Sequence, residues 1–190
     1  MKAKAPGQSA FLLMDVIDIL NSRRIPYAVI GAFAAAFHGA VRASLDADAL
    51  ISLPPARQDM RDLLDELRKA GWNVQYRKGD SSDPVGAVVN IEDRFNNRVD
   101  LLMNIRGVTE AVFSRTLKTE FSGARILMIG LEDFIAMKIF AGSPKDLGDV
   151  TAVLKVSYDR INRVLLKELV GKYGKGALAK LESFLKESKA

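Results

Sequence analysis

The stretch Gly31-Ala-Phe-Ala-Ala-Ala-Phe-His-Gly-Ala-Val-Arg-Ala-Ser-Leu-Asp-Ala-Asp48 decides the fold of this 190-residue chain. The apolar residues 27–30 before it predict a buried strand that ends at Gly31. The alanine-rich residues 32–37 predict a short helix, and residues 47–53 predict a second strand that begins beside two aspartates. This order of strand, helix and strand indicates a mixed α/β fold.

The two aspartates are the first candidate site. Side chains alternate along a strand, so Asp46 and Asp48 project from one face about 7 Å apart, with Ala47 turned to the other face. Two carboxylates in that relation repel each other unless a cation lies between them. For an isolated Asp-x-Asp motif, a pair that faces water is the commoner arrangement.

The surrounding residues favour a metal and phosphate site over that arrangement. The helix after Gly31 presents backbone N–H groups that can bind a phosphate. Arg42 precedes the aspartates, at a distance from which it can reach a phosphate or pair with a carboxylate. Asp100 lies among apolar residues in the predicted strand 98–102, where a carboxylate is costly unless it pairs, with Arg98 for example, or coordinates a cation. If the two strands are neighbours, three carboxylates form a cluster suited to two metal ions and to phosphoryl or nucleotidyl transfer.

The rest of the chain divides into a mixed region and a helical region. Pro54-Pro55 is expected to open a helix that ends at Gly71, and Ser9 is expected to cap an N-terminal helix. We therefore expect an α/β core over residues 1–130 and a C-terminal helical region, packed on that core, over residues 131–190. The remaining expected elements are a helix at 9–23, strands at 72–77, 85–91, 98–105, 116–121 and 125–129, and helices at 108–114, 131–141, 144–156, 161–173 and 176–188.

The composition excludes several kinds of site. The chain has no cysteine and one histidine, which excludes a disulfide framework, a thiolate nucleophile, a cysteine-containing zinc site and a multi-histidine metal site. Any metal is therefore expected to be held by carboxylates, which favour hard cations such as Mg²⁺.

The formal net charge of +5 comes from the last forty residues. Residues 1–150 carry 19 basic and 19 acidic side chains, whereas residues 151–190 carry 9 basic and 4 acidic ones. A solvated helical face is the ordinary explanation for such a stretch. If the protein binds RNA, the RNA backbone is expected along the basic side chains of Lys155, Arg160, Arg163, Lys167, Lys172 and Lys175.

The sequence predicts a cytoplasmic protein without membrane contact. Residues 25–41 lack a formal charge, but this run is too short for a spanning helix and contains Pro26, Gly31 and Gly39. Asp15 and Asp18 interrupt the apolar run near the N-terminus that a signal peptide would need.

The order of these motifs resembles a known superfamily. Strand, Gly-Ala, helix and then Arg42-x-Ser44-x-Asp46-x-Asp48 are similar to the minimal nucleotidyltransferase pattern of the DNA polymerase β superfamily. Within that superfamily the chain most resembles the AbiEii/MenT-like bacterial nucleotidyltransferases of abortive-infection and toxin–antitoxin systems. The similarity extends through Asp100 to Glu132-Asp-Phe-Ile-Ala-Met-Lys138 and Lys145-Asp146-x-x-Asp149, over about residues 25–155.

The resemblance implies a fold, a reaction and a set of roles. The fold would be a short mixed sheet flanked by helices with a C-terminal helical bundle, and the reaction would be Mg²⁺-dependent transfer of a nucleoside monophosphate from an NTP to an acceptor hydroxyl. Gly31 and Ala32 would let the backbone approach the triphosphate, and Asp46, Asp48 and Asp100 would hold the metal ions, with Asp100 also helping to activate the acceptor. Lys138 would neutralise triphosphate charge, while Asp146 and Asp149 would orient Lys138 or Lys145 or assist proton transfer. Arg42, Ser44 and Lys145 complete the nucleotide-binding set.

The acceptor and the activity stay open at this stage. The resembled group suggests tRNA, another RNA or a protein as acceptor, with a possible antitoxin partner, and antibiotics are acceptors in more distant relatives. Ala32 stands where the family has a second glycine or a serine, so no side-chain hydroxyl is available there for a phosphate. That departure motivates an alternative, a non-catalytic module that binds a nucleotide or a partner protein. A third hypothesis, a basic RNA-binding helical protein, rests on the charge of the C-terminal residues.

Overall fold

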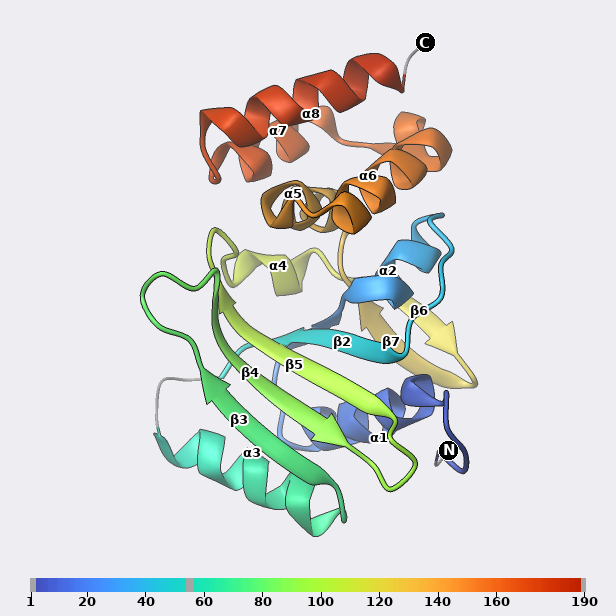
Figure 1. Ribbon diagram of the computed structural model, residues 1–190, viewed down its shortest axis with the longest axis vertical. Coiled ribbons are helices and arrows are strands. Elements are labelled where there is room, and N and C mark those ends of the chain that lie inside the picture. The colour runs from blue at the N-terminus through green and yellow to red at the C-terminus, as the bar shows by residue number, and fades with distance from the viewer. Residues whose placement is uncertain (1–2, 54–56, 189–190) are drawn as a thin grey trace.

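A computed structural model describes residues 3–53 and 57–188 of the chain (Figure 1). Within these ranges the strands form one seven-stranded mixed sheet. The strands are β1 (Tyr27–Val29), β2 (Asp46–Ile51), β3 (Asn73–Lys78), β4 (Val85–Glu92), β5 (Arg98–Ile105), β6 (Leu117–Phe121) and β7 (Ala124–Met128). The α-helices are α1 (Ser9–Ser22), α2 (Gly31–Phe37), α3 (Arg57–Lys69), α4 (Ala111–Ser114), α5 (Leu131–Ala141), α6 (Pro144–Ser157), α7 (Arg163–Gly171) and α8 (Lys175–Glu187), with a 3-10 turn at Tyr158–Arg160.

The sheet has the order β3-β4-β5-β2-β1-β7-β6, which places β2 at its centre. On one side β2 pairs with β1 in antiparallel fashion, and on the other it pairs with β5 in parallel. The chain between β2 and β5 forms α3 and the antiparallel strands β3 and β4. The expected hairpins at β4–β5 and β6–β7 are confirmed. This topology brings the starts of β2 and β5 side by side.

Side-chain alternation gives the sheet one apolar face and one polar face over β4 and β5. On β5, Val99 and Leu101 are fully buried, whereas Arg98, the first residue of the strand, is exposed. Helices α1 and α3 pack against the apolar face, as expected for an antiparallel region with one solvated side. Figure 1 looks onto the other face of β3, β4 and β5, in front of which no helix passes.

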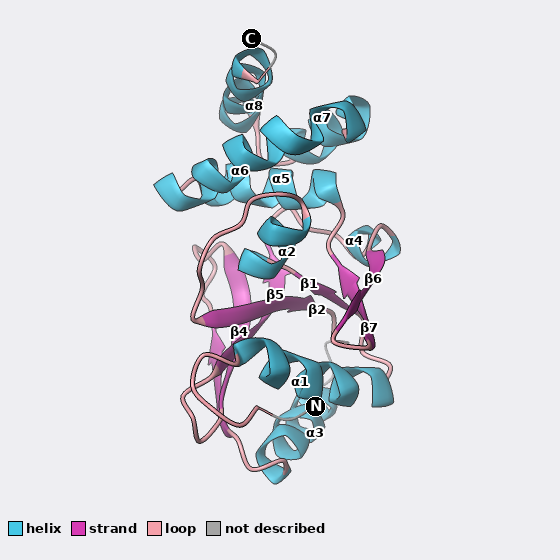
Figure 2. Cartoon of the chain, turned by 90° about the vertical axis from the view of Figure 1, so that its right-hand side faces the viewer, coloured by secondary structure: helices cyan, strands magenta, loops and turns pink. Residues whose placement is uncertain are grey.

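The helices after β7 gather at one end of the molecule, above the sheet in Figure 2. Helix α5 is the innermost and contacts α6, α7 and α8, with Phe134, Ile135 and Ile139 fully buried. A bidentate ion pair, with Arg115 nitrogens 2.7 and 2.6 Å from the Asp133 carboxylate oxygens, joins the segment after α4 to α5. The division of the chain at residue 130 stays a prediction.

One expected helix cap differs from the structure, and one expected helix start lies outside the described residues. Ser9 is the first residue of α1 and does not cap it; its hydroxyl donates to the Leu45 carbonyl and accepts from the Arg98 backbone N–H. Ser9 therefore ties α1 to the segments that lead into β2 and β5. The expected helix start at Pro54-Pro55 lies outside the described residues. Across the described ranges, no helix combines the length and apolar character needed to cross a bilayer.

A matched pair of truncations tests how much the apolar face of the sheet stabilises the fold. Leu101 is fully buried on β5, whereas Leu45 is 85% exposed. We expect Leu101→Ala to lower the free energy of unfolding by about 2–5 kcal/mol, because it leaves a cavity, and Leu45→Ala to change it by less than about 0.5 kcal/mol. Urea denaturation of both variants checks this. Equal losses would contradict the assignment of the core to this face.

Candidate active site

Three aspartates lie on one face of two neighbouring strands. In the parallel register of β2 and β5, Asp48 is the direct partner of Asp100, and Asp46 stands two residues before Asp48. Side chains of paired residues, and of residues two apart, point to the same face of a sheet. Ala47 and Val99 between them are fully buried on the opposite face. The predicted juxtaposition of Asp46, Asp48 and Asp100 is therefore present.

The three carboxylates act on one another electrostatically. The pKa of Asp48 is raised to about 6, first by burial and then by the negative charges of Asp46 and Asp100. The positive charges of Lys138 and Lys145 act in the opposite direction on Asp48. A carboxyl group whose ionised form is this unfavourable is suited to binding a cation.

Each of the outer carboxylates also has a neutral partner. The Ser44 hydroxyl donates to Asp46, and the Asn90 side-chain amide donates to Asp100 Oδ1 over 2.7 Å. The ion pair considered for Asp100 with Arg98 does not form, because Arg98 Nε lies 3.0 Å from Glu92 Oε2 on the neighbouring strand. Asn90 is a site residue that the sequence interpretation missed.

The donor set fits a hard cation, although the side chains are not drawn together around one point. Carboxylate oxygens on a single face are the ligands that Mg²⁺ prefers. Among residues 3–53 and 57–188, however, no group of three or more His, Cys, Asp or Glu side chains is close enough to hold a metal ion as it stands.

Gly31 is required at the turn from β1 into α2. Its backbone is left-handed, with φ at +63°, a conformation that favours glycine. A methyl group at this position would lie 1.9 Å from Asp48 Oδ2. Ala32 follows with its side chain buried. The glycine thus brings the start of α2 against the central carboxylate of the cluster.

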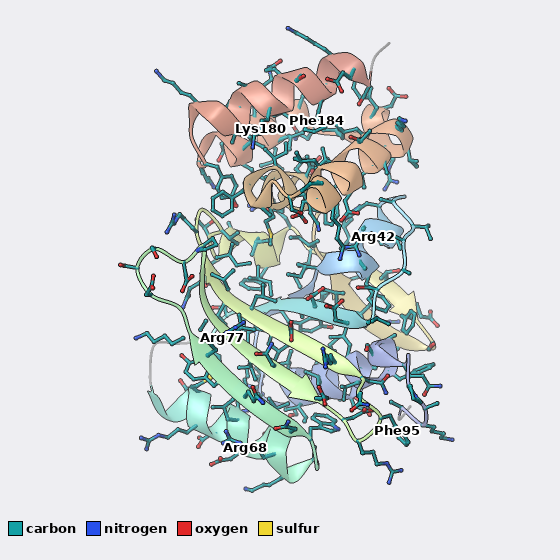
Figure 3. All side chains as sticks on the ribbon, viewed as in Figure 1. Arg42, Arg68, Arg77, Phe95, Lys180 and Phe184 are labelled. Atoms are coloured by element: carbon teal, nitrogen blue, oxygen red, sulfur yellow. The ribbon has the colours of Figure 1, made fainter. Side chains whose placement is uncertain are left out.

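A second group of charges lies beside this cluster and is centred on Asp149. The Asp149 side chain is 4% exposed, and its Oδ1 accepts from Arg42 Nε over 2.9 Å. Its Oδ2 lies 2.9 Å from Lys138 Nζ, an ion-pair contact without hydrogen-bond geometry. Of the two partners proposed for Arg42, a phosphate or a carboxylate, the structure contains the carboxylate. Figure 3 shows Arg42 between α2 and the helices above it.

Lys138 also bonds to Asp146. Its Nζ lies 2.6 Å from Asp146 Oδ1, while Ser143 caps α6 and donates its hydroxyl to Asp146 Oδ2. Burial raises the pKa of Asp146, but the hydrogen bonds from Lys138 and Ser143 outweigh it, so the pKa is lowered overall. Asp146 and Asp149 are thus placed to orient Lys138, as the resemblance implied, whereas Lys145 lies on the exposed side of α6.

Two cavities include aspartates of the cluster in their linings. The first, of about 250 Å³, is mostly apolar and is lined by Gly31, Asp48 and Lys138 together with Phe134 and Met137 of α5. The second, of about 260 Å³, is polar and includes Asp46 and Asp100 in its lining. None of the six basic residues expected to contact RNA lines either cavity. They are Lys155, Arg160, Arg163, Lys167, Lys172 and Lys175.

The comparison with known families decides the assignment. The family described as "Nucleotidyltransferase of unknown function (DUF6036)" matches residues 8–184 of the chain. The chain belongs to this nucleotidyltransferase family. No curated protein matches it.

Solved structures of nucleotidyltransferases have the same fold. The crystal structure of ANT(2")-Ia in complex with adenylyl-2"-tobramycin is 13% identical, with a TM-score of 0.60, and the alignment covers 88% of this chain and 99% of that one. A putative nucleotidyltransferase, TM1012 from Thermotoga maritima, is 17% identical, with a TM-score of 0.54 and coverages of 73% and 88%. The lincomycin-bound lincosamide antibiotic adenylyltransferase LnuA is 10% identical, with a TM-score of 0.50 and coverages of 81% and 99%. These likenesses establish the α/β nucleotidyltransferase fold.

Substituting Gly31 tests the close approach of α2 to Asp48 in this nucleotidyltransferase. Gly31→Ala is expected to cost about 2 kcal/mol more in unfolding free energy than Gly123→Ala, because its methyl group overlaps the Asp48 carboxylate. Gly123 is the matched control: its φ is also positive, at +81°, but a methyl group there would meet nothing within 4 Å. Chemical denaturation of the two variants checks the difference. Equal losses of unfolding free energy in Gly31→Ala and Gly123→Ala would show that the Asp48 side chain can move away from the added methyl group at no cost.

The raised pKa of Asp48 predicts a pH-dependent stability. Because the folded-state pKa of about 6 lies above the ordinary 3.8, the folded state binds the proton more tightly and loses stability as the pH rises from about 4 to about 6. With a chelator present to remove metal ions, Asp48→Asn should therefore be more stable than the natural protein at pH 7.5. The gain in unfolding free energy should be about 3 kcal/mol at most. That advantage should shrink toward pH 4.

Denaturation curves from pH 4 to pH 8 measure this effect. Asp65→Asn is the control, because Asp65 is an exposed residue of α3 with a side chain that is 62% accessible. The change in unfolding free energy caused by Asp65→Asn should not show the pH dependence expected for Asp48→Asn. A loss of stability in Asp48→Asn at pH 7.5 would contradict the electrostatic description of the cluster.

Proposed function

We propose that this protein is a Mg²⁺-dependent enzyme that transfers a nucleoside monophosphate from an NTP to an acceptor hydroxyl and releases pyrophosphate. The observation that carries the proposal is the face of β2 and β5 that holds Asp46, Asp48 and Asp100 beside Gly31. Mg²⁺ bound there would neutralise the charge that develops on the phosphate oxygens during transfer.

The apolar cavity is the candidate nucleotide site. It has Gly31 and Asp48 on one side and Lys138 on the other, with Phe134 and Met137 as apolar lining. In this proposal the base and sugar pack on the apolar lining, while the triphosphate lies between Lys138 and the backbone at Gly31. Asp149 holds Arg42 and Lys138 at fixed positions, which keeps two cations near the phosphates at no extra ordering cost.

Asp100 is the candidate proton acceptor for the attacking hydroxyl. Its Oδ1 already accepts from Asn90, so the second oxygen is the one available to the acceptor. Asn90 would hold the carboxylate in place during the transfer. Asp46 and Asp48 would then bind and orient the nucleotide through the cation.

The finer family assignment and the biological role are also proposals. The motif order that includes Lys138 and Asp146-x-x-Asp149 supports an AbiEii/MenT-like enzyme. In this proposal it is the toxin of a toxin–antitoxin or abortive-infection system, with tRNA, another RNA or a protein as acceptor and an antitoxin as partner. Two structures of similar fold contain antibiotics, adenylyl-2"-tobramycin in one and lincomycin in the other, and these support a small molecule as acceptor instead.

Label transfer from each NTP tests the proposed reaction. The protein is incubated with labelled NTP, Mg²⁺ and either total tRNA or a panel of small hydroxyl-bearing molecules. We expect transfer with at least one acceptor and a loss of about a thousandfold or more in the Asp46→Ala, Asp48→Ala double variant. The control is Asp62→Ala, Asp65→Ala, an equal change on the accessible side of α3, which should keep the rate.

The other outcomes favour the other two hypotheses. Intact nucleotide binding by calorimetry without any transfer would support the non-catalytic module that Ala32 suggests. RNA binding that ignores both aspartates and falls steeply with salt, without transfer from any NTP, would support a basic RNA-binding protein. Either result would overturn the proposed reaction.

A further inference from the structure

Two rows of polar side chains cross four neighbouring strands on the face that carries the aspartates. The cross-strand registers place the members of each row directly beside one another. The first row is Asn73, Glu92, Arg98 and Asp46, and the second is Gln75, Asn90, Asp100 and Asp48. Both rows run without a break from the edge strand β3 to the central strand β2.

The rows line a hollow on the solvated face of the sheet. Seven of the eight side chains, all except Asp48, line the polar cavity of about 260 Å³. Asn90, Glu92, Asp46 and Asp100 are each partly buried. A polar sheet face alone is ordinary, but a cavity of this size with three amide side chains at its wall can hold a small ligand by hydrogen bonds.

The position of this cavity fits the second substrate. Asp48 lines the apolar cavity assigned to the nucleotide, whereas its cross-strand partner Asp100 lines the polar one. The reacting phosphate would therefore lie between the two cavities, at the aspartates. Transfer in line requires the acceptor hydroxyl on the side opposite the leaving group, which is the side of the polar cavity.

We propose that the polar cavity is the acceptor subsite and that it takes a small, hydroxyl-rich molecule without negative charge. This inference rests on the proposed nucleotidyl transfer and adds the class of its acceptor. Asn73, Gln75 and Asn90 supply amide donors and acceptors for hydroxyl or amino groups. Asp100 at the inner end accepts the proton of the hydroxyl that reacts.

The charges around the cavity disfavour a polyanion such as RNA. Its lining holds three carboxylates, Asp46, Asp100 and Glu92, against one cation, Arg98, which is paired with Glu92 at 3.0 Å. The Mg²⁺ of the proposed reaction would offset part of this negative charge but would add no lysine or arginine for a phosphate backbone. Arg77 is on the same face of β3 but beyond the rows and outside this lining. RNA binding depends on lysine and arginine along the phosphates, and the basic helices at the C-terminus do not line the cavity.

Substitutions at Gln75 test the subsite. Gln75 is exposed on the edge strand, so a change there leaves the core intact. The probes are tobramycin as a cationic polyol, myo-inositol as a neutral polyol and total tRNA as a polyanion. Gln75→Ala and Gln75→Lys should both weaken binding of a small polyol, measured by calorimetry without nucleotide, by about two- to tenfold. They should raise its KM to the same extent.

Two variants on the opposite edge strand serve as controls. Glu120→Gln on β6 raises the net charge by one, as Gln75→Lys does, and Lys118→Ala is a truncation like Gln75→Ala. Both should leave polyol binding unchanged. Three outcomes would each overturn the acceptor proposal. They are unchanged polyol binding in both Gln75 variants, binding of neither polyol to the natural protein, and tRNA binding that strengthens in Gln75→Lys.

The proposed reaction and the acceptor class fail in different ways. Calorimetry with each NTP, together with pyrophosphate release that depends on Asp46 and Asp48, tests the reaction. Transfer to tRNA with normal dependence on these aspartates would preserve the reaction and overturn the acceptor class. Polyol binding that depends on Gln75, without NTP binding, would preserve the subsite as a ligand site and overturn the reaction.

Discussion

The parallel pairing of β2 with β5 is the constraint on which the rest of the site depends. It sets Asp48 against Asp100 and Asp46 against Arg98. A slip of one residue would turn Asp100 into the core and Val99 to the solvent, so the apolar face packed on α1 and α3 fixes the register. The hydrophobic core thus positions the carboxylates although it lies on the opposite side of the sheet.

The cluster of aspartates carries an electrostatic cost, which positive charges nearby reduce. Burial, and then the negative charges of Asp46 and Asp100, disfavour ionisation of Asp48, whose pKa is raised to about 6. Lys138 of α5 and Lys145 of α6 act in the opposite direction on the pKa of Asp48. Asp149 forms ion pairs with both Lys138 and Arg42. Stability is thereby lowered locally at the aspartates, as is common where ionisable groups are clustered at functional sites.

The sequence was sufficient for most strands and helices and for the shared face of Asp46 and Asp48, because alternation along a strand is a local pattern. It placed Asp100 beside them only on the condition that the two strands are neighbours, which the pairing of β2 with β5 fulfils. It was insufficient for the partners of these side chains. The bonds Asn90–Asp100 and Arg98–Glu92 depend on the register of β4 with β5, and Arg42 meets Asp149 across 107 residues of chain. Whether Asp46, Asp48 and Asp100 bind metal stays a prediction, since residue types alone do not bring side chains around one point.

The pairing of β2 with a strand fifty residues later also determines when the site can form during synthesis. As the chain leaves the ribosome, β2 has only β1 as a neighbour until β5 emerges, and Arg42 lacks its partner until Asp149 follows. Contacts this distant in sequence form late and slowly. A nascent chain that ends before α6 therefore carries the aspartates on an incomplete scaffold, without the ion pairs that Asp149 makes with Arg42 and Lys138.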